Sequence, residues 1–250
     1  MSSFIETAIF SFLMGFSIYL SLPIVLRKKT NEKTTRILNA VAIGILIFLI
    51  SDVFSDAAPL LYNNGSPGNY IAIPSLGIAF AVALAVGFFM LYYFENRSKK
   101  GLSPDRMSLM IATGIGLQNL TEGLVFGSTS GSIGLFSGVA LVILIGFTLQ
   151  NITEGFPIAA PFLNNEKKLG TMVLLFLIGG LPTVIGGITG FYYSSTLFNI
   201  FFDGLAIGAI LYVILPMIKH QLRDIDPTKQ KTIYIGIFLG FMIGFLVNLI

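Results

Sequence analysis

Eight long apolar stretches alternate with short polar segments along the chain. Their approximate bounds are 4–26, 37–62, 70–94, 107–127, 135–163, 169–190, 196–218 and 232–250. Each is near the roughly 20 residues that an α-helix needs to cross a lipid bilayer, and a helix satisfies its own backbone hydrogen bonds there. The pattern therefore predicts an all-α integral membrane protein with eight transmembrane helices, in which residues 1–250 form a single transmembrane domain.

The polar segments between these stretches divide into two kinds by charge. All 15 Lys and Arg residues fall in segments 27–36, 95–106, 164–168 and 219–231, whereas segments 63–69, 128–134 and 191–195 contain none. The positive-inside rule places the basic segments in the cytoplasm. Both termini are then extracellular, and we expect a multi-pass protein of the plasma membrane.

The composition agrees with a membrane environment and excludes some chemistry. The chain is 54% hydrophobic and 11% charged, against roughly 25% charged residues in an average soluble domain. It has no cysteine, so disulfides and thiolate metal sites are excluded. Because the basic residues are confined to short segments, we expect the lipid bilayer, and no nucleic acid, as a partner.

One six-residue phrase occurs twice within apolar stretches, as Gln-Asn-Leu-Thr-Glu-Gly at 118–123 and Gln-Asn-Ile-Thr-Glu-Gly at 150–155. On an α-helix the first, second and fifth positions of the phrase share one face. Each copy therefore forms a stripe of oxygen-bearing side chains. The stripes consist of Gln118, Asn119 and Glu122, and of Gln150, Asn151 and Glu154. If the two stripes face each other, they enclose a cage of oxygen atoms within the membrane.

The predicted topology places the two phrases on helices of opposite direction, each near mid-span. This gives an inverted pseudo-symmetry centred on spans 107–127 and 135–163, and such symmetry is typical of transporters. The alternative is that two similar helices pack together and the amides only join them. Two glutamates at membrane depth argue against that alternative, because ionisable side chains are costly there.

Carboxylate side chains inside the predicted spans are a second indication of a functional site. Apart from Glu6 near the outer end of the first span, five lie within the predicted spans, and no Lys, Arg or His lies in any span to pair with them. They are Asp52, Asp56, Glu122, Glu154 and Asp203. At roughly 2.5–3.5 kcal/mol per mid-span charge, leaving them unpaired would cost more than about 10 kcal/mol. We therefore expect protonated, hydrated or cation-bound acids. Asp52, Asp56 and Asp203 are predicted to form an acidic pathway to the glutamates, or to supply additional ligands.

The chemistry of the stripes favours hard cations. They offer carboxylates, amides and the hydroxyl groups of Thr121 and Thr153. This set suits Mn²⁺, Mg²⁺ or Fe²⁺ better than Zn²⁺, for which His and Cys are the usual ligands. The one histidine, His220, lies in a basic segment, where we expect a surface residue rather than a ligand.

The two phrases resemble the metal-binding motifs of the ZIP zinc/iron permeases. The similarity is best to the prokaryotic GufA-like branch, whose fourth and fifth helices carry His-Asn-x-Pro-Glu-Gly and Gln-Asn-x-Pro-Glu-Gly. Residues 204–209 and Tyr212 also resemble the seventh helix of that branch. The eight spans and extracellular termini of that family agree with the topology predicted above.

The resemblance implies a binuclear metal site between the fourth and fifth helices. Its ligands would be Gln118, Asn119, Glu122, Gln150, Asn151 and Glu154. It further implies that Zn²⁺, Fe²⁺ or Mn²⁺ is a transported substrate moved toward the cytoplasm, with no resident cofactor and no enzymatic activity. Members of the family commonly act as homodimers and move one helix bundle against another.

The chain departs from the family pattern at several positions. Gln118 stands where the family has histidine, and Thr121 and Thr153 stand where it has proline. Leu181-Pro182 replaces an acid-proline pair that is frequent in the sixth helix. The soft nitrogen ligand and a bridging carboxylate are therefore missing, and the three intramembrane aspartates supply acids that the usual pattern lacks.

Three other functions compete with metal transport. In a proton-linked carrier of another solute, Glu122 and Glu154 would exchange protons and bind no metal. A membrane-embedded aspartyl hydrolase would use Asp52 or Asp203 and would need two aspartates converging on one substrate pocket. A purely structural role is the last alternative, and the cost of burying the acids argues against it.

Overall fold

The computed structural model describes residues 4–23, 32–62, 73–96, 103–163, 169–193, 195–222 and 227–249. These residues form α1 (Phe4–Phe16) with the 3₁₀ segment η1 (Ser17–Ser21), α3 (Glu32–Leu61), α4 (Pro74–Asn96), α5 (Pro104–Ile133), α6 (Gly138–Ala159) with η3 (Ala160–Phe162), α7 (Leu169–Tyr192), α8 (Thr196–Leu222) and α9 (Pro227–Asn248). Within them, eight helical segments are long and apolar enough to cross a membrane. The prediction of a multi-pass, all-α membrane protein is confirmed.

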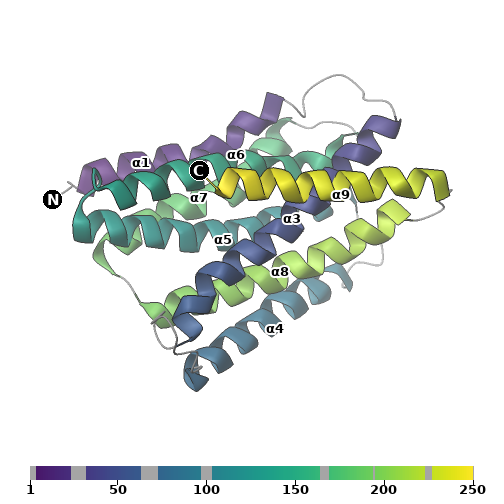
Figure 1. Cartoon of the computed structure of the whole chain (residues 1–250). Helices are drawn as coiled ribbons and strands as arrows, with labels where there is room; N and C mark the ends of the chain where they lie inside the picture. The colour runs from purple at the N-terminus through teal and green to yellow at the C-terminus, as the bar shows by residue number, and fades with distance from the viewer. Residues whose placement is uncertain are drawn as a thin grey trace.

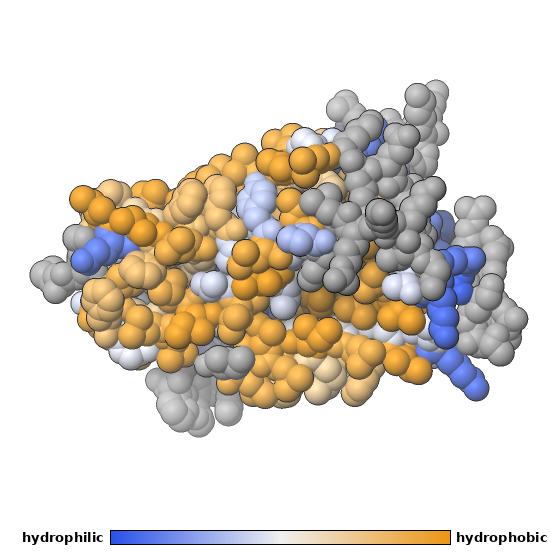
Figure 2. Space-filling model, turned by 90° about the horizontal axis from the view of Figure 1, so that it is seen from above, coloured by the Kyte–Doolittle hydropathy of each residue, from blue (hydrophilic) through white to orange (hydrophobic). Residues whose placement is uncertain are grey.

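The helices run back and forth between the two ends of one elongated bundle (Figure 1). Large apolar side chains, such as Phe89, Tyr93 and Phe238, are exposed on its sides. Figure 2 shows apolar residues over most of the visible surface between the ends, with the largest hydrophilic group at the right-hand end. A surface of this kind is suited to lipid rather than to water.

Basic side chains in the described part of the chain gather at one end of the bundle. Lys33 and Arg36 lie near the start of α3, Arg106 near the start of α5, Lys219 near the end of α8 and Lys231 near the start of α9. These helix ends lie together at the right of Figure 1, whereas α1 begins at the left. We call them the basic end and the opposite end of the bundle.

Tight helix contacts divide the bundle into two groups. At several crossings a glycine lies so close to a backbone carbonyl that an added Cβ would overlap the oxygen. This occurs at Gly123 against Thr183 (α5 and α7), Gly208 against Leu84 (α8 and α4), and Gly240 against Val41 (α9 and α3). Small residues of this kind let membrane helices approach closely.

The remaining contacts complete these two groups. Helix α1 packs on α7, and η1 and α5 pack on α6, so α1, η1, α5, α6 and α7 form what we call the α5 group. Helix α3 packs on α8, which joins α3, α4, α8 and α9 in the α8 group. The two groups meet where α5 contacts α8 and where α6 contacts α3 and α9.

One sequence prediction about the connections is wrong. Residues 128–134 were expected to form a polar turn, but helix α5 continues through them to Ile133. The turn begins at Gly134, the described glycine with a positive φ of 92°. The hydroxyl group of Ser130 shares a hydrogen bond of 2.7 Å with Thr7 of α1, and neighbouring serines bond to carbonyls of the preceding turn. These contacts stabilise a helical end that local composition disfavours.

The other element boundaries differ from the prediction mainly at helix ends. Helices α3, α5 and α9 each begin a few residues earlier than the apolar stretches, because their first turns are polar. Parts of the predicted spans and polar segments, such as 24–26, 63–72 and 164–168, lie outside the described residues.

Substitution of Gly208 by alanine tests the tight crossing of α4 and α8. The added methyl group overlaps the Leu84 carbonyl oxygen, and overpacking of this kind typically costs about 1–3 kcal/mol. We expect Gly208→Ala to lower the midpoint of thermal unfolding of the detergent-purified protein. Gly146→Ala is the matched control, because an added Cβ there meets nothing within 4 Å. Equal midpoints for the two variants would contradict the assigned contact.

Candidate functional site

The two repeated phrases lie against each other in the interior of the bundle. Gln118, Asn119 and Glu122 project from α5 and Gln150, Asn151 and Glu154 from α6, and each of these six side chains is at most 4% exposed. Glu122 Oε1 accepts two hydrogen bonds, from Gln118 Nε2 at 3.0 Å and from Gln150 Nε2 at 2.9 Å. The stripes predicted from sequence therefore face each other across α5 and α6.

The two asparagines join three helices. Asn119 Nδ2 donates to Asn151 Oδ1 at 2.7 Å and to the carbonyl oxygen of Gly179, on α7, at 3.0 Å. Asn151 Nδ2 donates to the Phe147 carbonyl oxygen at 2.9 Å. These bonds hold α5, α6 and α7 in register around the glutamates. The asparagines thus have a structural role that the sequence did not indicate, in addition to their predicted role as ligands.

Unpartnered oxygen atoms are the distinctive feature of the site. Among the described residues, eight buried side-chain oxygen or nitrogen atoms have no hydrogen-bond partner, and all eight are oxygens. Six belong to the phrases: Gln118 Oε1, Asn119 Oδ1, Glu122 Oε2, Gln150 Oε1, and Glu154 Oε1 and Oε2. The amide nitrogens of both phrases all donate to acceptors. Each amide nitrogen of the site therefore has an acceptor, whereas six oxygens have no donor.

No positive side chain compensates for this excess of oxygen. In the described part of the chain the one ion pair joins Arg36 to Glu32, at 2.6 Å, at the start of α3. Buried charges are normally paired or coordinated, since desolvation is otherwise uncompensated. The acceptors of the site are thus electrostatically matched to a cation, which would supply the positive charge that the protein lacks there.

Asp52 extends the hydrogen-bond network to the α8 group. This residue of α3 is 7% exposed. Its Oδ2 accepts from Gln150 Nε2 at 2.9 Å, and its Oδ1 accepts from Asn248 Nδ2, in the last turn of α9, at 2.6 Å. Sequence reasoning singled out Asp52 but missed Asn248. A polar residue within the last apolar stretch was the available signal.

A small cavity of about 40 Å³ lies beside Glu122, on the side of the site nearer the opposite end of the bundle. It is lined by Val53, Asp56, Leu60, Gln118, Thr121, Glu122, Val125, Phe147, Asn199 and Asp203. A space of roughly 10–15 Å³ holds one water molecule, so this cavity has room for a few waters or one ion. The structure therefore brings Asp56 and Asp203 together with Glu122, as the predicted acidic pathway requires.

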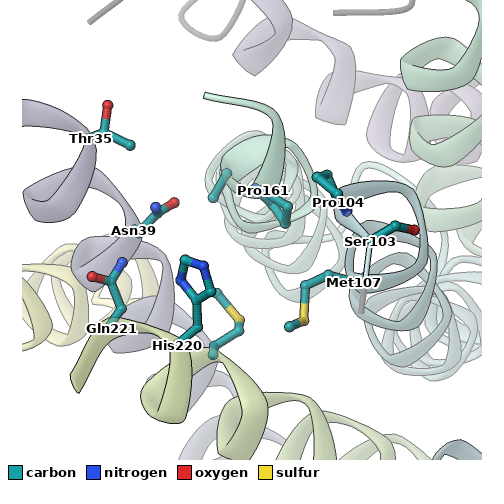
Figure 3. A pocket seen from close by; sticks show the side chains of 10 residues that line it. Thr35, Asn39, Ser103, Pro104, Met107, Pro161, His220 and Gln221 are labelled. Carbon is teal, nitrogen blue, oxygen red and sulfur yellow. The ribbon is translucent and has the colours of Figure 1, made fainter. Parts of the chain in front are cut away.

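A larger cavity of about 350 Å³ opens at the basic end (Figure 3). Its lining residues come from α3, α5, η3 and α8 and from the residue before α5, and they are Thr35, Asn39, Ser103, Pro104, Met107, Ala160, Pro161, Met217, His220 and Gln221. His220 is exposed, as predicted, but it also lines this cavity. This cavity could not be predicted from the sequence, because its lining combines residues from segments far apart in the chain.

The residues described here do not form a conventional metal cluster. No group of three or more His, Cys, Asp and Glu side chains that could hold a metal ion occurs among them. A cation at the phrases would therefore need amide oxygens in addition to the two glutamates. The hydroxyl groups of Thr121 and Thr153 donate to the carbonyl oxygens of Gln118 and Gln150, each at 2.7 Å.

Fold and site together define a multi-pass α-helical membrane protein with a buried, oxygen-rich polar centre and a cavity toward each end. No protein-family model matches the chain, and no curated protein matches it.

Substitution of Asn119 by leucine tests the structural role of the asparagine pair. It leaves the buried acceptors of Asn151 and Gly179 without a donor, which typically costs about 1–3 kcal/mol for each buried polar group. We expect a clear fall in the free energy of unfolding of the metal-free protein. Asn96→Leu is the control, because Asn96 is exposed at the end of α4 and donates to Tyr92 within its own helix. A loss of stability no larger than in the control would contradict the role.

Proposed function

We propose that the protein is a divalent metal cation transporter of the ZIP type, which moves ions such as Zn²⁺, Fe²⁺ or Mn²⁺ across the plasma membrane toward the cytoplasm. The observation that carries this proposal is the set of six unpartnered buried oxygens on the two phrases. Carboxylate and amide oxygens without donors are the groups that hard divalent cations bind. The two glutamates would balance the charge of one such ion.

The ligand chemistry follows from the side chains present. Glu122 Oε2, both oxygens of Glu154, and the amide oxygens of Gln118, Gln150 and Asn119 are available. None is nitrogen or sulfur, so the set favours Mn²⁺ or Fe²⁺ over Zn²⁺. Asp52, by contrast, has both oxygens engaged with amide donors. It contributes negative charge to the site rather than a free ligand atom.

The two cavities support a transport path rather than a closed structural site. Asp56 and Asp203 line the small cavity beside Glu122, and an acidic funnel of this kind concentrates cations. The larger cavity opens at the basic end, which the positive-inside rule assigns to the cytoplasm. Movement of the α5 group against the α8 group would connect the site to each cavity in turn.

The finer features of the topology are part of the same proposal. Both termini would be extracellular, and α5 and α6 would be related by an inverted pseudo-symmetry. The protein would act as a homodimer, as the resemblance to the ZIP permeases implies.

A proton-linked carrier of another solute is the alternative. Glu154 favours it to some extent, because a protonated carboxyl group also tolerates a site without donors to its oxygens. Metal binding explains more of the structure, since it accounts for the unpartnered amide oxygens as well. Measurement of metal affinity separates the two functions.

Substitution of the two glutamates tests the metal site. We expect purified wild-type protein to bind Mn²⁺ saturably, and Glu122→Gln and Glu154→Gln each to raise the Kd at least about tenfold, since loss even of outer-shell partners costs about 10–100-fold. Radioactive Mn²⁺ uptake by proteoliposomes should fall in parallel. An unchanged Kd in both variants would exclude the metal site, and proton-dependent uptake of another solute would then support the alternative carrier.

Gln118→His serves as the gain-of-ligand variant in the same assays. It restores the nitrogen ligand of the family pattern, so we expect affinity to shift toward Zn²⁺ relative to Mn²⁺. No shift for any metal would contradict the assignment of Gln118 as a ligand.

Cysteine labelling tests the orientation. The chain has no native cysteine, so single substitutions can be labelled without background. Tyr193→Cys, between α7 and α8, should react with a membrane-impermeant maleimide in intact cells. Lys219→Cys, at the basic end of α8, should react only after permeabilisation. The reverse pattern would show that the basic end faces outward.

A further inference from the structure

Two amides cover the carboxylate of Asp52, one on each oxygen. Gln150 Nε2 donates to Oδ2 at 2.9 Å, and Asn248 Nδ2 donates to Oδ1 at 2.6 Å. The donors come from opposite groups of the bundle, because Gln150 lies on α6 and Asn248 on α9. Asp52 is therefore held in place at the seam between the α5 group and the α8 group.

The Gln150 amide is in turn held by two carboxylates. Its nitrogen donates to Asp52 Oδ2 and to Glu122 Oε1, both at 2.9 Å. An ionised carboxylate can only accept hydrogen bonds. A flipped amide would place its oxygen against both acids and lose both bonds. Gln150 Oε1 is consequently fixed on the other side of the amide, where it is buried and has no partner.

We infer that Asp52 and Asn248 are positioning residues, which orient the Gln150 amide so that its carbonyl oxygen is presented to a divalent cation. The relay runs from Asn248 to Asp52, from Asp52 to Gln150, and from Gln150 Oε1 to the ion. This inference rests on the proposed function and adds two residues to it. It gives Asp52 a positioning role in place of the expected role as a ligand, because each of its oxygens already accepts an amide hydrogen bond.

The relay has a mechanical consequence, since it crosses between the two groups of helices. Displacement of the α8 group removes Asp52 from Gln150 and leaves the amide with Glu122 as its one acidic acceptor. The amide then loses its fixed orientation, and the cation loses an oriented ligand. Ion affinity and the relative position of the two groups are thereby coupled.

A polarity swap between positions 52 and 248 tests the relay. In the double variant Asp52→Asn/Asn248→Asp, the new amide at position 52 donates to the new carboxylate at position 248. It still offers an oxygen to Gln150 Nε2. The single variants have no such arrangement. Asp52→Asn allows two orientations of the new amide, and Asn248→Asp places two carboxylates, at positions 52 and 248, against each other.

The readout is the Kd for Mn²⁺ of the full-length detergent-purified protein, together with the visible absorption spectrum of bound Co²⁺. We expect each single variant to raise the Kd about tenfold and alter the Co²⁺ spectrum, as loss of outer-shell partners does. The double variant should restore the wild-type spectrum and bring the Kd within a factor of about three of wild type, because the restored relay again orients the ligand. Thermal unfolding without metal identifies any variant that does not fold.

Two further variants keep the test decisive. Asn248→Ala removes one donor at an exposed position, so it should fold and still weaken Mn²⁺ binding. Asn96→Asp makes the same chemical change as Asn248→Asp at the end of α4, and it should leave the Kd unchanged.

Three other outcomes would contradict the relay, or both the relay and the proposed function. If the double variant binds as poorly as Asp52→Asn alone, the carboxylate itself is needed and the relay is wrong. If the variants at 52 and 248 bind normally while Glu154→Gln does not, the relay is wrong and the proposed function stands. If the wild-type protein binds no Mn²⁺ or Co²⁺, the proposed function and the relay both fail.

Discussion

Burial of carboxylate and amide oxygens with neither a hydrogen-bond donor nor a basic side chain beside them is the constraint on which the structure depends. Among the described residues, the amide nitrogens of Gln118, Asn119 and Gln150 donate to Glu122, Asn151 and Asp52. In the described part of the chain, the buried side-chain polar atoms that have no hydrogen-bond partner are all oxygens, six of them on the two phrases. A protein that retained such a set for stability alone would gain by replacing it with apolar side chains. The arrangement is understandable if positive charge arrives from outside the chain.

The architecture around this site combines close helix crossings within each group with a polar contact between the groups. Glycine at the helix crossings brings backbones together within each group, as at Gly123 of α5 and Gly240 of α9. Between the groups, the polar contact from Asp52 to Gln150 lies beside the site itself. The small cavity also lies at this seam, lined by α5 and α6 on one side and by α3 and α8 on the other. If the protein transports an ion as proposed, the part of the interface that rearranges would also be the part that contacts the ion.

The sequence was sufficient for the membrane class, the eight helices and the meeting of the two phrases, because hydropathy and helical periodicity are local properties. It was insufficient where distant segments cooperate. The turn moved to Gly134 because Ser130 bonds to α1, and Asn119 gained a structural role through the Gly179 carbonyl. The contact of Asn248 with Asp52 and the lining of the larger cavity could not be assigned, since nothing in a single segment indicates its neighbour across the bundle. The metal itself, the flux direction and the dimer stay predictions.

The hydrogen bonds by which Asn119 joins α5 to α6 and α7 have a consequence for discrimination among ions. Asn119 bonds to Asn151 and to the Gly179 backbone, so the helices would set the distance between the two stripes whether or not an ion is bound. A binding site of fixed width cannot contract around a smaller ion or expand around a larger one. Ions of equal charge would then be sorted by ionic radius and by the cost of dehydration. The width of the gap, as much as the chemistry of its oxygens, would decide what passes.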